Sequence, residues 1–187
     1  YGYVEIFKAP QPALASVRRH VPDVLLEYHA EGLWVTQPDM EAAYPFDQEL
    51  ATAVTHLETL GGRWMNHECA SKQMAGYAFG TYLPPLFTRI SAEVTAEHIR
   101  LVQDRLDQQF LGRDGQAPLF LFEMPPLTYF ALGDLPIAEF FRVIADLTPC
   151  GMVLDIGHLW TVCRYSGEYQ RKGLSEFLTE FLEVFPL

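Results

Sequence analysis

The chain has 187 residues, of which 49% are hydrophobic, and this length and composition fit one domain with a substantial core. Its formal net charge of −11 at pH 7 argues against binding to nucleic acid or to an anionic membrane surface. Charged residues make up only 20% of the chain and aromatic residues 13%, a composition that excludes an intrinsically disordered protein. No apolar run reaches the roughly 18 residues that a membrane span needs.

The chain opens on Tyr1-Gly-Tyr-Val-Glu-Ile, which already has the pattern of a strand. It lacks an initiating methionine and a signal peptide, so we expect a piece of a longer chain. Its three cysteines are too few and too scattered for a disulfide framework, and we expect buried thiols in a reducing compartment. These observations predict a cytoplasmic protein. The cysteines are Cys69, Cys150 and Cys163.

The first half of the chain alternates between strand-like and helix-like patterns. Pro12 suits the first turn of a helix because its φ is fixed. Leu50, Val54 and Leu57 form one apolar stripe, and Gly61 follows where that helix would end. The pattern predicts strands over residues 2–7, 21–29 and 63–67, helices from residue 12 and over 46–60, and a long loop over 30–43.

Residues 68–89 are predicted to form an irregular, packed loop, because glycines and the pair Pro84-Pro85 interrupt them. The aromatic side chains of this loop have two interpretations. They form the floor of a substrate groove, or they pack only the loop itself. These side chains are Tyr77, Phe79, Tyr82 and Phe87.

The second half of the chain repeats the alternation. Thr95 is predicted to cap a helix whose apolar stripe starts at Ile99 and continues through Leu106. Two further apolar runs end at acidic residues, Glu123 and Asp155. The pattern predicts strands over 118–123 and 150–156, helices over 136–147 and 174–185, a turn over 112–115, and loops over 127–133 and 158–172.

The alternation amounts to about five β-α units, which strongly favours an α/β fold with a parallel sheet. A closed TIM-type (β/α) barrel needs eight strands. We therefore expect one domain over residues 1–187 that supplies about the first five β-α units of such a barrel; an open sheet is the alternative.

Four strands are predicted to end in groups that bind metals: His29, His67, Glu123 and Asp155. In a parallel sheet all strands point the same way, so these side chains are expected to meet at one rim. His158 lies three residues after Asp155 and could serve the same ion or an adjacent one. Histidine nitrogen and carboxylate oxygen together suit iron, manganese or zinc better than magnesium or calcium.

A structural interpretation stands beside the metal site. A single histidine at a strand end is often a hydrogen-bonded structural residue, and a single carboxylate there often caps a helix or pairs with a base. The pattern of three histidines at strand ends favours the metal site. The other three, His20, His56 and His98, fall in predicted helices and are expected to titrate in solvent.

Several neighbours of these residues have two interpretations. Glu5 could orient a ligating histidine or occupy an ordinary alternating position, and Asn66 and Glu68 could orient the ring of His67 or face water. Cys69 could be a redox thiol, although a buried structural thiol is the more common case. The sequence contains no Walker motif, nucleotide fingerprint, nucleophile elbow or paired CxxC.

Six blocks in the sequence resemble those of the DUF692 proteins, the multinuclear non-heme iron-dependent oxidases (MNIO), in the same order across nearly the whole chain. Tyr28-His-Ala-Glu-Gly-Leu is similar to that family's "LHGVGL", Asn66-His-Glu-Cys-Ala-Ser to "SEHLAWS", and Tyr82-Leu-Pro-Pro-Leu-Phe-Thr to "LLPLPYT". The others are His98-Ile-Arg-Leu-Val-Gln-Asp-Arg-Leu, similar to "RIRxVQDRL", Phe120-Leu-Phe-Glu, similar to "LLENPS", and Thr148-Pro-Cys-Gly-Met-Val-Leu-Asp, similar to "TGCGLLLDVNN".

This resemblance implies a TIM-type barrel that holds two or three iron ions, uses O2 and modifies cysteines of ribosomally made precursor peptides, often with a partner protein that presents the peptide. It also implies that His29, His67, Glu123, Asp155 and His158 match iron-ligand positions. The chain departs from the family at Met124, where asparagine is usual, and at Gly157-His158, which replaces Asn-Asn. The family's ligands from strands six to eight lie beyond the chain.

Two other functions remain open at this point. One is a divalent-metal isomerase or endonuclease of the xylose-isomerase-like barrels, which also hold His, Glu and Asp at strand ends and usually prefer Mn, Mg or Zn. The other is a barrel without catalytic activity that serves as a peptide-binding scaffold. No residue can be assigned as a general base from the sequence.

Overall fold

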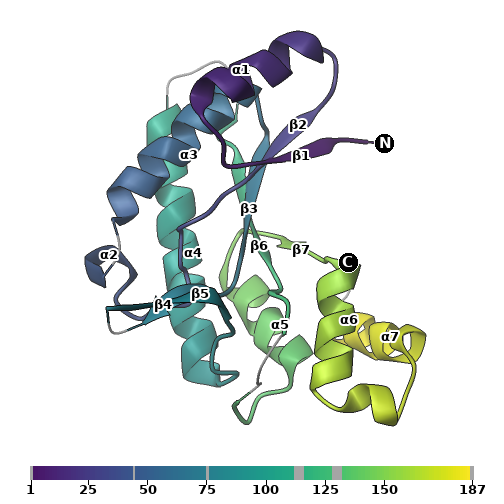
Figure 1. The fold of residues 1–187 in the computed structure, drawn as a ribbon. Coiled ribbons are helices and arrows are strands. Elements are labelled where there is room, and N and C mark those ends of the chain that lie inside the picture. Colours follow the sequence, from purple (N-terminus) through teal and green to yellow (C-terminus); the bar gives the residue numbers. More distant parts are fainter. Residues whose placement is uncertain (1, 44, 75, 112–115, 128–131, 186–187) are drawn as a thin grey trace.

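The chain forms an α/β structure around a parallel sheet in the computed structural model, which describes residues 2–43, 45–74, 76–111, 116–127 and 132–185 (Figure 1). The predicted parallel sheet is confirmed. Within the described residues it has five strands in the order β1-β2-β3-β6-β7, with every neighbouring pair parallel. The strands are β1 (Val4–Phe7), β2 (Leu26–His29), β3 (Trp64–Glu68), β6 (Leu119–Glu123) and β7 (Met152–Val153).

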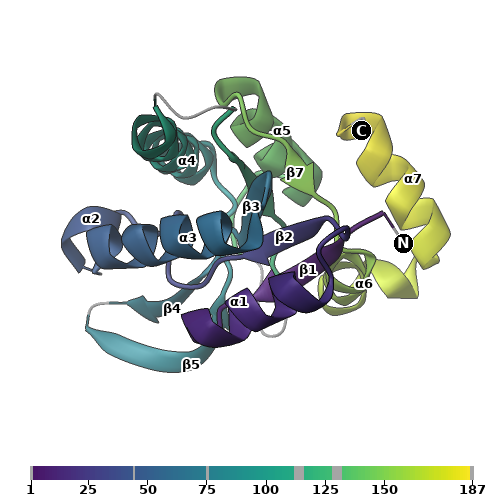
Figure 2. The same ribbon diagram turned by 90° about the horizontal axis from the view of Figure 1, so that it is seen from above.

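Helices lie in an arc outside the curved sheet, as seen from above in Figure 2. The two outermost strands, β1 and β7, each pair with a single neighbour among the described residues. The arrangement is therefore compatible with part of an α/β barrel. The helices are α1 (Gln11–His20), α2 (Met40–Ala43), α3 (Phe46–Leu60), α4 (Arg89–Phe110), α5 (Ile137–Leu147), α6 (Ile156–Tyr165), α7 (Leu174–Val184) and the 3₁₀ turn η1 (Glu168–Gln170).

Helix α3 follows its sequence pattern closely. Its apolar stripe, which includes Leu50, Val54 and Leu57, is buried. The helix ends at Gly61, whose φ of 65° places it in the left-handed region that favours glycine. The predicted bounds of α3 are confirmed, and those of α1, α5 and α7 differ from the prediction by a residue or so.

Helix α4 begins six residues before the predicted cap Thr95. Its N-cap is Thr88, whose hydroxyl oxygen accepts a hydrogen bond from the N–H of Ser91 at 3.2 Å. Thr95 lies inside the helix, is fully buried and donates its hydroxyl proton to the Ser91 carbonyl at 2.8 Å. The prediction was wrong because a helix that follows Pro84-Pro85 was read as a continuing loop.

The region predicted as one irregular loop, residues 68–89, contains an antiparallel hairpin of β4 (Ser71–Met74) and β5 (Tyr77–Leu83). Gly76 and Gly80 have φ values of 81° and 66°, in the region that favours glycine. Gly76 lies in the turn of the hairpin, and Gly80 lies within β5. The predicted loop over 30–43 likewise contains the short helix α2.

The predicted strand over 150–156 is reduced to β7, because Asp155 caps a helix instead of ending a strand. Residues 156–165, most of which were predicted to be a loop, form α6. The predicted strand over 21–29 begins only at Leu26. The predicted turn over 112–115 and most of the predicted loop over 127–133 lie outside the described residues.

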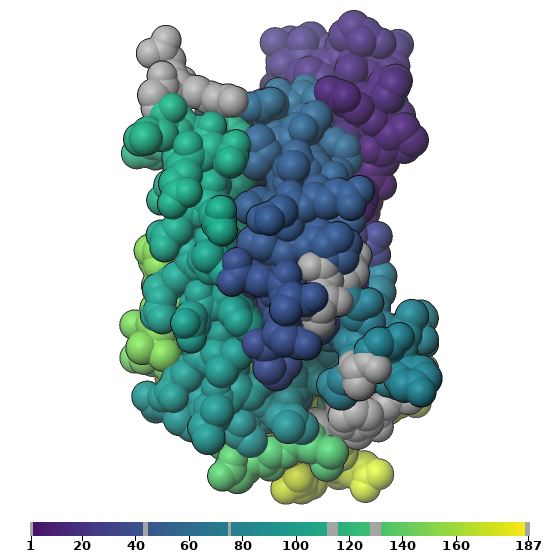
Figure 3. Space-filling view, turned by 90° about the vertical axis from the view of Figure 1, so that its left-hand side faces the viewer, coloured from purple at the N-terminus to yellow at the C-terminus, as the bar shows by residue number. Residues whose placement is uncertain are grey.

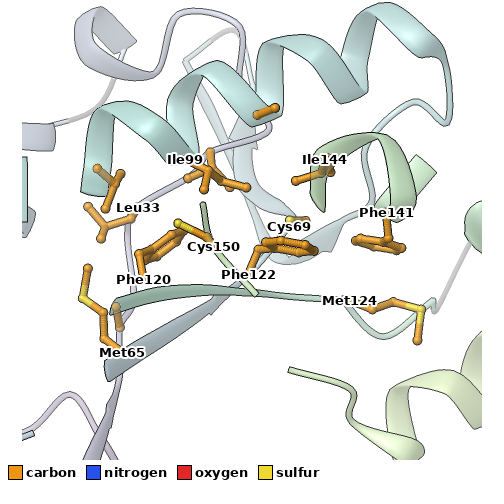
Figure 4. Packing of buried hydrophobic residues seen from close by; sticks show 14 of the residues in the cluster. Leu33, Met65, Cys69, Ile99, Phe120, Phe122, Met124, Phe141, Ile144 and Cys150 are labelled. Atoms are coloured by element: carbon orange, nitrogen blue, oxygen red, sulfur yellow. The ribbon is translucent and has the colours of Figure 1, made fainter. Parts of the chain in front are cut away.

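The core lies between the sheet and the helices. Phe120 and Phe122 of β6 are fully buried and point toward Ile99 of α4 and Ile144 of α5 (Figure 4). Helices α3 and α4 form a continuous outer layer on this side (Figure 3). Within the described ranges, we find no helix with both the length and the apolar character that a bilayer span requires.

Candidate metal centre

Alternation along the strands separates an apolar face of the sheet from a polar face. Phe120 and Phe122 face the helices, so their neighbours along β6 occupy the opposite face. Strand register then places one set of polar residues together on that opposite face. These residues are Glu5, Glu27, His29, Asn66, Glu68 and Glu123.

Glu123 lies at the centre of this set. One carboxylate oxygen, Oε2, accepts a hydrogen bond from the side-chain amide of Asn66 at 2.7 Å and lies 3.7 Å from His29 Nε2. The other oxygen, Oε1, lies 3.3 Å from Nδ1 of His158. The carboxylate is only 4% exposed, so it connects two histidines inside the protein.

His29 presents one ring nitrogen to two carboxylates. Its Nδ1 lies 3.0 Å from the Ala30 carbonyl oxygen. Because that oxygen can only accept a hydrogen bond, Nδ1 carries a proton, and in a neutral ring Nε2 carries a lone pair. That Nε2 lies 3.4 Å from Glu68 Oε2 and 3.7 Å from Glu123 Oε2. A bare lone pair facing two carboxylates is repelled, so the position favours a cation at Nε2, either a proton or a metal ion.

The pKa values reflect this arrangement. Burial alone would lower the pKa of His29, but the hydrogen bond and charge of Glu68 outweigh it and raise that pKa above its ordinary value. Burial would raise the pKa of Glu68, yet His29 and His67 lower it to about 2. His29 and Glu68 are thus a buried acid–base pair, with 3.4 Å between His29 Nε2 and Glu68 Oε2.

A second group consists of Glu123, Asp155 and His158, whose ligand atoms all lie within 4.8 Å of one another. His158 Nδ1 donates to the Met124 carbonyl at 2.8 Å, which directs its Nε2 to the position 4.0 Å from Asp155 Oδ2. Asp155 Oδ1 accepts the N–H of His158 at 2.9 Å as the helix cap, so Oδ2 is the oxygen left for an ion. A histidine fixed through Nδ1 by a backbone carbonyl is typical of metal ligands.

His67 borders the group of His29 and Glu68, with its ring centroid 6.5 Å from that of His29 and its Nδ1 4.0 Å from Glu68 Oε2, but its ring is held differently. It is in register with Phe122, on the face of β3 turned toward the helices, and it is fully buried. Its Nδ1 donates to the Glu68 carbonyl at 2.7 Å, and its Nε2 accepts the N–H of Gly32 at 3.1 Å. Burial lowers its pKa to about 4, so the ring is neutral. Metal binding through Nε2 requires the contact with Gly32 to break.

The residues expected to orient the ligands lie where they can do so. Asn66 orients Glu123 rather than the ring of His67. Burial raises the pKa of the half-buried Glu5, whose electrostatic neighbours are His29 and Glu123. Glu68 contacts His29 directly and is itself a possible oxygen ligand.

Three other side chains differ in how they relate to the centre. Cys69 is fully buried, and burial raises the pKa of its thiol, which fits the structural interpretation. Glu27 lies apart from the centre, where its Oε2 accepts the N–H groups of Arg63 and Trp64. Tyr82 of the hairpin is a neighbour of Glu68; burial, followed by the charge of Glu68, raises its pKa and keeps it a phenol.

The prediction for the remaining histidines is wrong for His56, which is buried with its Nδ1 3.1 Å from the hydroxyl of Tyr28. His20 is exposed, and His98 is half-buried with Nδ1 2.8 Å from the Val35 carbonyl. Two further residues were not predicted to belong to the site: Trp34, which packs against His67, and Lys72, which packs against Tyr82. The low number of lysines in the chain could have drawn attention to Lys72.

Comparisons with known proteins give a distant and partial similarity. The chain matches no family model. A UPF0276 protein of Paraburkholderia phytofirmans is 28% identical to it over 114 residues, which are 59% of this chain and 32% of that protein. The similar stretch thus covers about a third of the length of this relative.

Proposed function

We propose that this chain is the first part of a TIM-type barrel of the DUF692 class, a multinuclear non-heme iron-dependent oxidase. The parallel sheet with polar strand ends supports the barrel. The six sequence blocks, in the order of that family, support the class. The proposed reaction is oxidative modification of cysteine in a ribosomally made precursor peptide, with O2 as co-substrate. It takes place in the cytoplasm, and a partner protein can present the peptide.

The observation that carries this proposal is the position of Glu123 between two histidines. His29 and His158 both donate Nδ1–H to a backbone carbonyl, so each presents Nε2 near a carboxylate. With Glu68 on one side and Asp155 on the other, the donor set has imidazole nitrogen and carboxylate oxygen for each of two ions. This donor set fits iron.

The residues of the chain would hold the ions and keep their surroundings dry. Glu123 would help to hold both ions, while Asn66 fixes the orientation of its carboxylate. The resemblance adds His67 to the ligands. Bound iron would supply open positions for O2 and for a substrate thiolate. Tyr82 stays protonated beside Glu68, so it can donate a hydrogen bond into the centre.

The test is elemental analysis of the full-length protein purified without oxygen. We expect iron in the unmodified protein and loss of most of it in Glu123→Gln, because that residue serves both sides of the centre. His158→Ala should lose part of the iron. His20→Ala, an exposed histidine on α1, is the control and should keep the full content.

Three outcomes would argue for other functions. Manganese, magnesium or zinc in place of iron would favour an isomerase or endonuclease of the xylose-isomerase-like barrels. Binding of a precursor peptide without O2 consumption would favour a scaffold. A protein free of transition metals would count against the oxidase proposal altogether.

A further inference from the structure

A cavity of about 270 Å³ lies beside the candidate metal centre, between the end of β1, the loop after β2 and the β4–β5 hairpin. Two of its lining residues contact His67. The N–H of Gly32 donates to His67 Nε2 at 3.1 Å, and the ring of Trp34 packs edge-on against it with centroids 4.9 Å apart. A ligand in the cavity would therefore be one side chain away from the centre.

Two of the few lysines of this acidic protein line the cavity, each paired with a carboxylate. The whole chain has three lysines and a formal net charge of −11. Two of these lysines, Lys8 and Lys72, line the cavity, and the third, Lys172, lies in the segment between η1 and α7. Both lysines already have partners: Lys8 Nζ lies 2.6 Å from Glu49 Oε2, and Lys72 contacts Glu31, so a further anion has to displace one of these carboxylates.

Aromatic rings hold Lys72 in place. Its Nζ lies 4.6 Å from the centre of the Tyr82 ring and 5.8 Å from that of the Trp34 ring. The same ammonium contacts the carboxylate of Glu31. That carboxylate is 43% exposed, so Glu31 can turn into solvent and be replaced by a carboxylate from outside.

We propose that this cavity binds a carboxylate of the substrate peptide through Lys72, next to the residue that is modified. The inference rests on the proposed function and adds to it that the substrate is acidic beside its reacting residue. In the protein alone, Glu31 occupies the position that the substrate carboxylate would take. The carboxylate has two sources, an Asp or Glu side chain and a free peptide C-terminus.

The hairpin next to the cavity suits an extended peptide. Tyr77 and Phe79 of β5 are 74% and 49% exposed, and the hairpin protrudes beside α3 (Figure 3). Within the described residues, β4 and β5 pair only with each other, and most of β5 is exposed, so a further strand could be added along β5. A peptide running along this hairpin would pass the mouth of the cavity, which Gln73 and Ala78 help to line.

The test uses the small number of lysines. Reductive methylation with ¹³C formaldehyde keeps the charge of each lysine and labels Lys8, Lys72 and Lys172, and the Lys72 signal is assigned by its absence from Lys72→Arg. The full-length protein is titrated with acetyl-Gly-Ser-Asp-Ser-Gly-amide, with its Asn analogue, and with the Asn analogue carrying a free C-terminus. We expect the Asp peptide to shift the signal of Lys72 and to leave that of Lys172 in place.

Variants separate the cavity from general charge effects. Lys72→Met should weaken binding of the Asp peptide about tenfold, since a charged hydrogen bond is lost. Glu31→Gln should strengthen binding, because it removes the internal competitor for Lys72. Lys172→Met is the matched control and should leave binding unchanged. If Lys72→Met fails to fold, Lys72→Gln is tested in its place.

The inference is wrong if no peptide shifts Lys72, if the Asp and Asn peptides shift it equally, or if Lys72→Met binds like the unmodified protein. A shift caused only by the free C-terminus would assign the cavity to a peptide end. Metal analysis of the same sample tests the proposed function separately. Iron without binding of the acidic peptides would remove only the inference, whereas such binding without iron would remove only the oxidase.

Discussion

Single side chains decide how the candidate centre is held. Asn66 is fully buried, and its amide donates to Glu123 Oε2 at 2.7 Å, the shortest contact of that carboxylate with a neighbouring side chain among the described residues. The residue thus fixes the carboxylate that both histidines approach. Asn66 could be recognised in the sequence as a neighbour of the centre, but its partner could not, because that partner lies on another strand.

Replacing Asn66 by alanine is expected to cost about 1.5–3 kcal/mol of unfolding free energy, because a hydrogen bond to a charged group is lost. Metal affinity should fall by about 10–100-fold, since the carboxylate loses its orientation. Urea unfolding and competition with a chelator measure the two effects. A variant with normal metal affinity would show that Asn66 only stabilises the fold.

His56 predicts a pH dependence of stability that is independent of the metal centre. Burial, assisted by the charge of Lys8, lowers its pKa below the ordinary 6.5, although Glu49 opposes the shift. Below pH 6.5 the unfolded chain therefore binds a proton that the folded chain refuses, and stability is lost as the pH falls through the folded pKa. Above pH 6.5 this contribution is fully present.

Urea unfolding between pH 8 and pH 5 should show a smaller loss of stability in His56→Gln than in the unmodified protein. Glutamine can still bond to the hydroxyl of Tyr28 but does not titrate. His20→Gln, on the exposed side of α1, is the control and should follow the unmodified protein. Parallel curves for all three proteins would assign the acid sensitivity to other groups.

At the scale of elements, one glycine joins the starts of two helices. Gly133 precedes α5 and bridges to Phe87, which precedes α4, and the N–H of Leu135 donates to the Phe87 carbonyl at 2.9 Å. The φ of Gly133 is 144°, and a Cβ added there would lie 2.0 Å from the Phe87 carbonyl oxygen. Only glycine permits this approach of two backbones.

Gly133→Ala is therefore expected to cost at least about 2 kcal/mol, because the backbone has to shift and its bridge to break. Gly173→Ala is the matched control. Its φ is −75° and its added Cβ meets nothing within 4 Å, so a change of about 0.5 kcal/mol or less is expected. Thermal unfolding compares the two, and equal melting temperatures would mean that the bridge contributes no stability.

The elements that the sequence predicted well are those with a long apolar period. Helices α3 and α5 carry stripes such as Leu50-Val54-Leu57, and their bounds agree within a residue. The β4–β5 hairpin was missed for two reasons: Gly80 interrupts the pattern of β5, and most of β5 is exposed. Strand β7 was overestimated because the Asp155 cap, a local hydrogen bond, ends the apolar run in a helix.

For the molecule as a whole, the prediction that strand ends share one rim was useful but incomplete. His29 and Glu123 do meet there, and Asp155 and His158 join them. His67 is in register with Phe122 on the other face of the sheet, yet its ring centroid lies 6.5 Å from that of His29, so it borders the centre. The two-residue period along β3 could have shown that His67 points to the face opposite Asn66 and Glu68. The hydrogen bond from Gly32 to His67 Nε2 could not be predicted, because it depends on the folded loop.

Because one carboxylate serves two neighbouring positions, their occupancies should be thermodynamically linked. An ion on the His158 side would fix Glu123 and thereby orient Oε2 for the His29 side. Binding of one ion would then change the affinity for the other, and by linkage the effect would be the same in both directions. Cation titrations of the protein should then deviate from two independent sites. Asp155→Asn would weaken loading even on the side that this residue never touches.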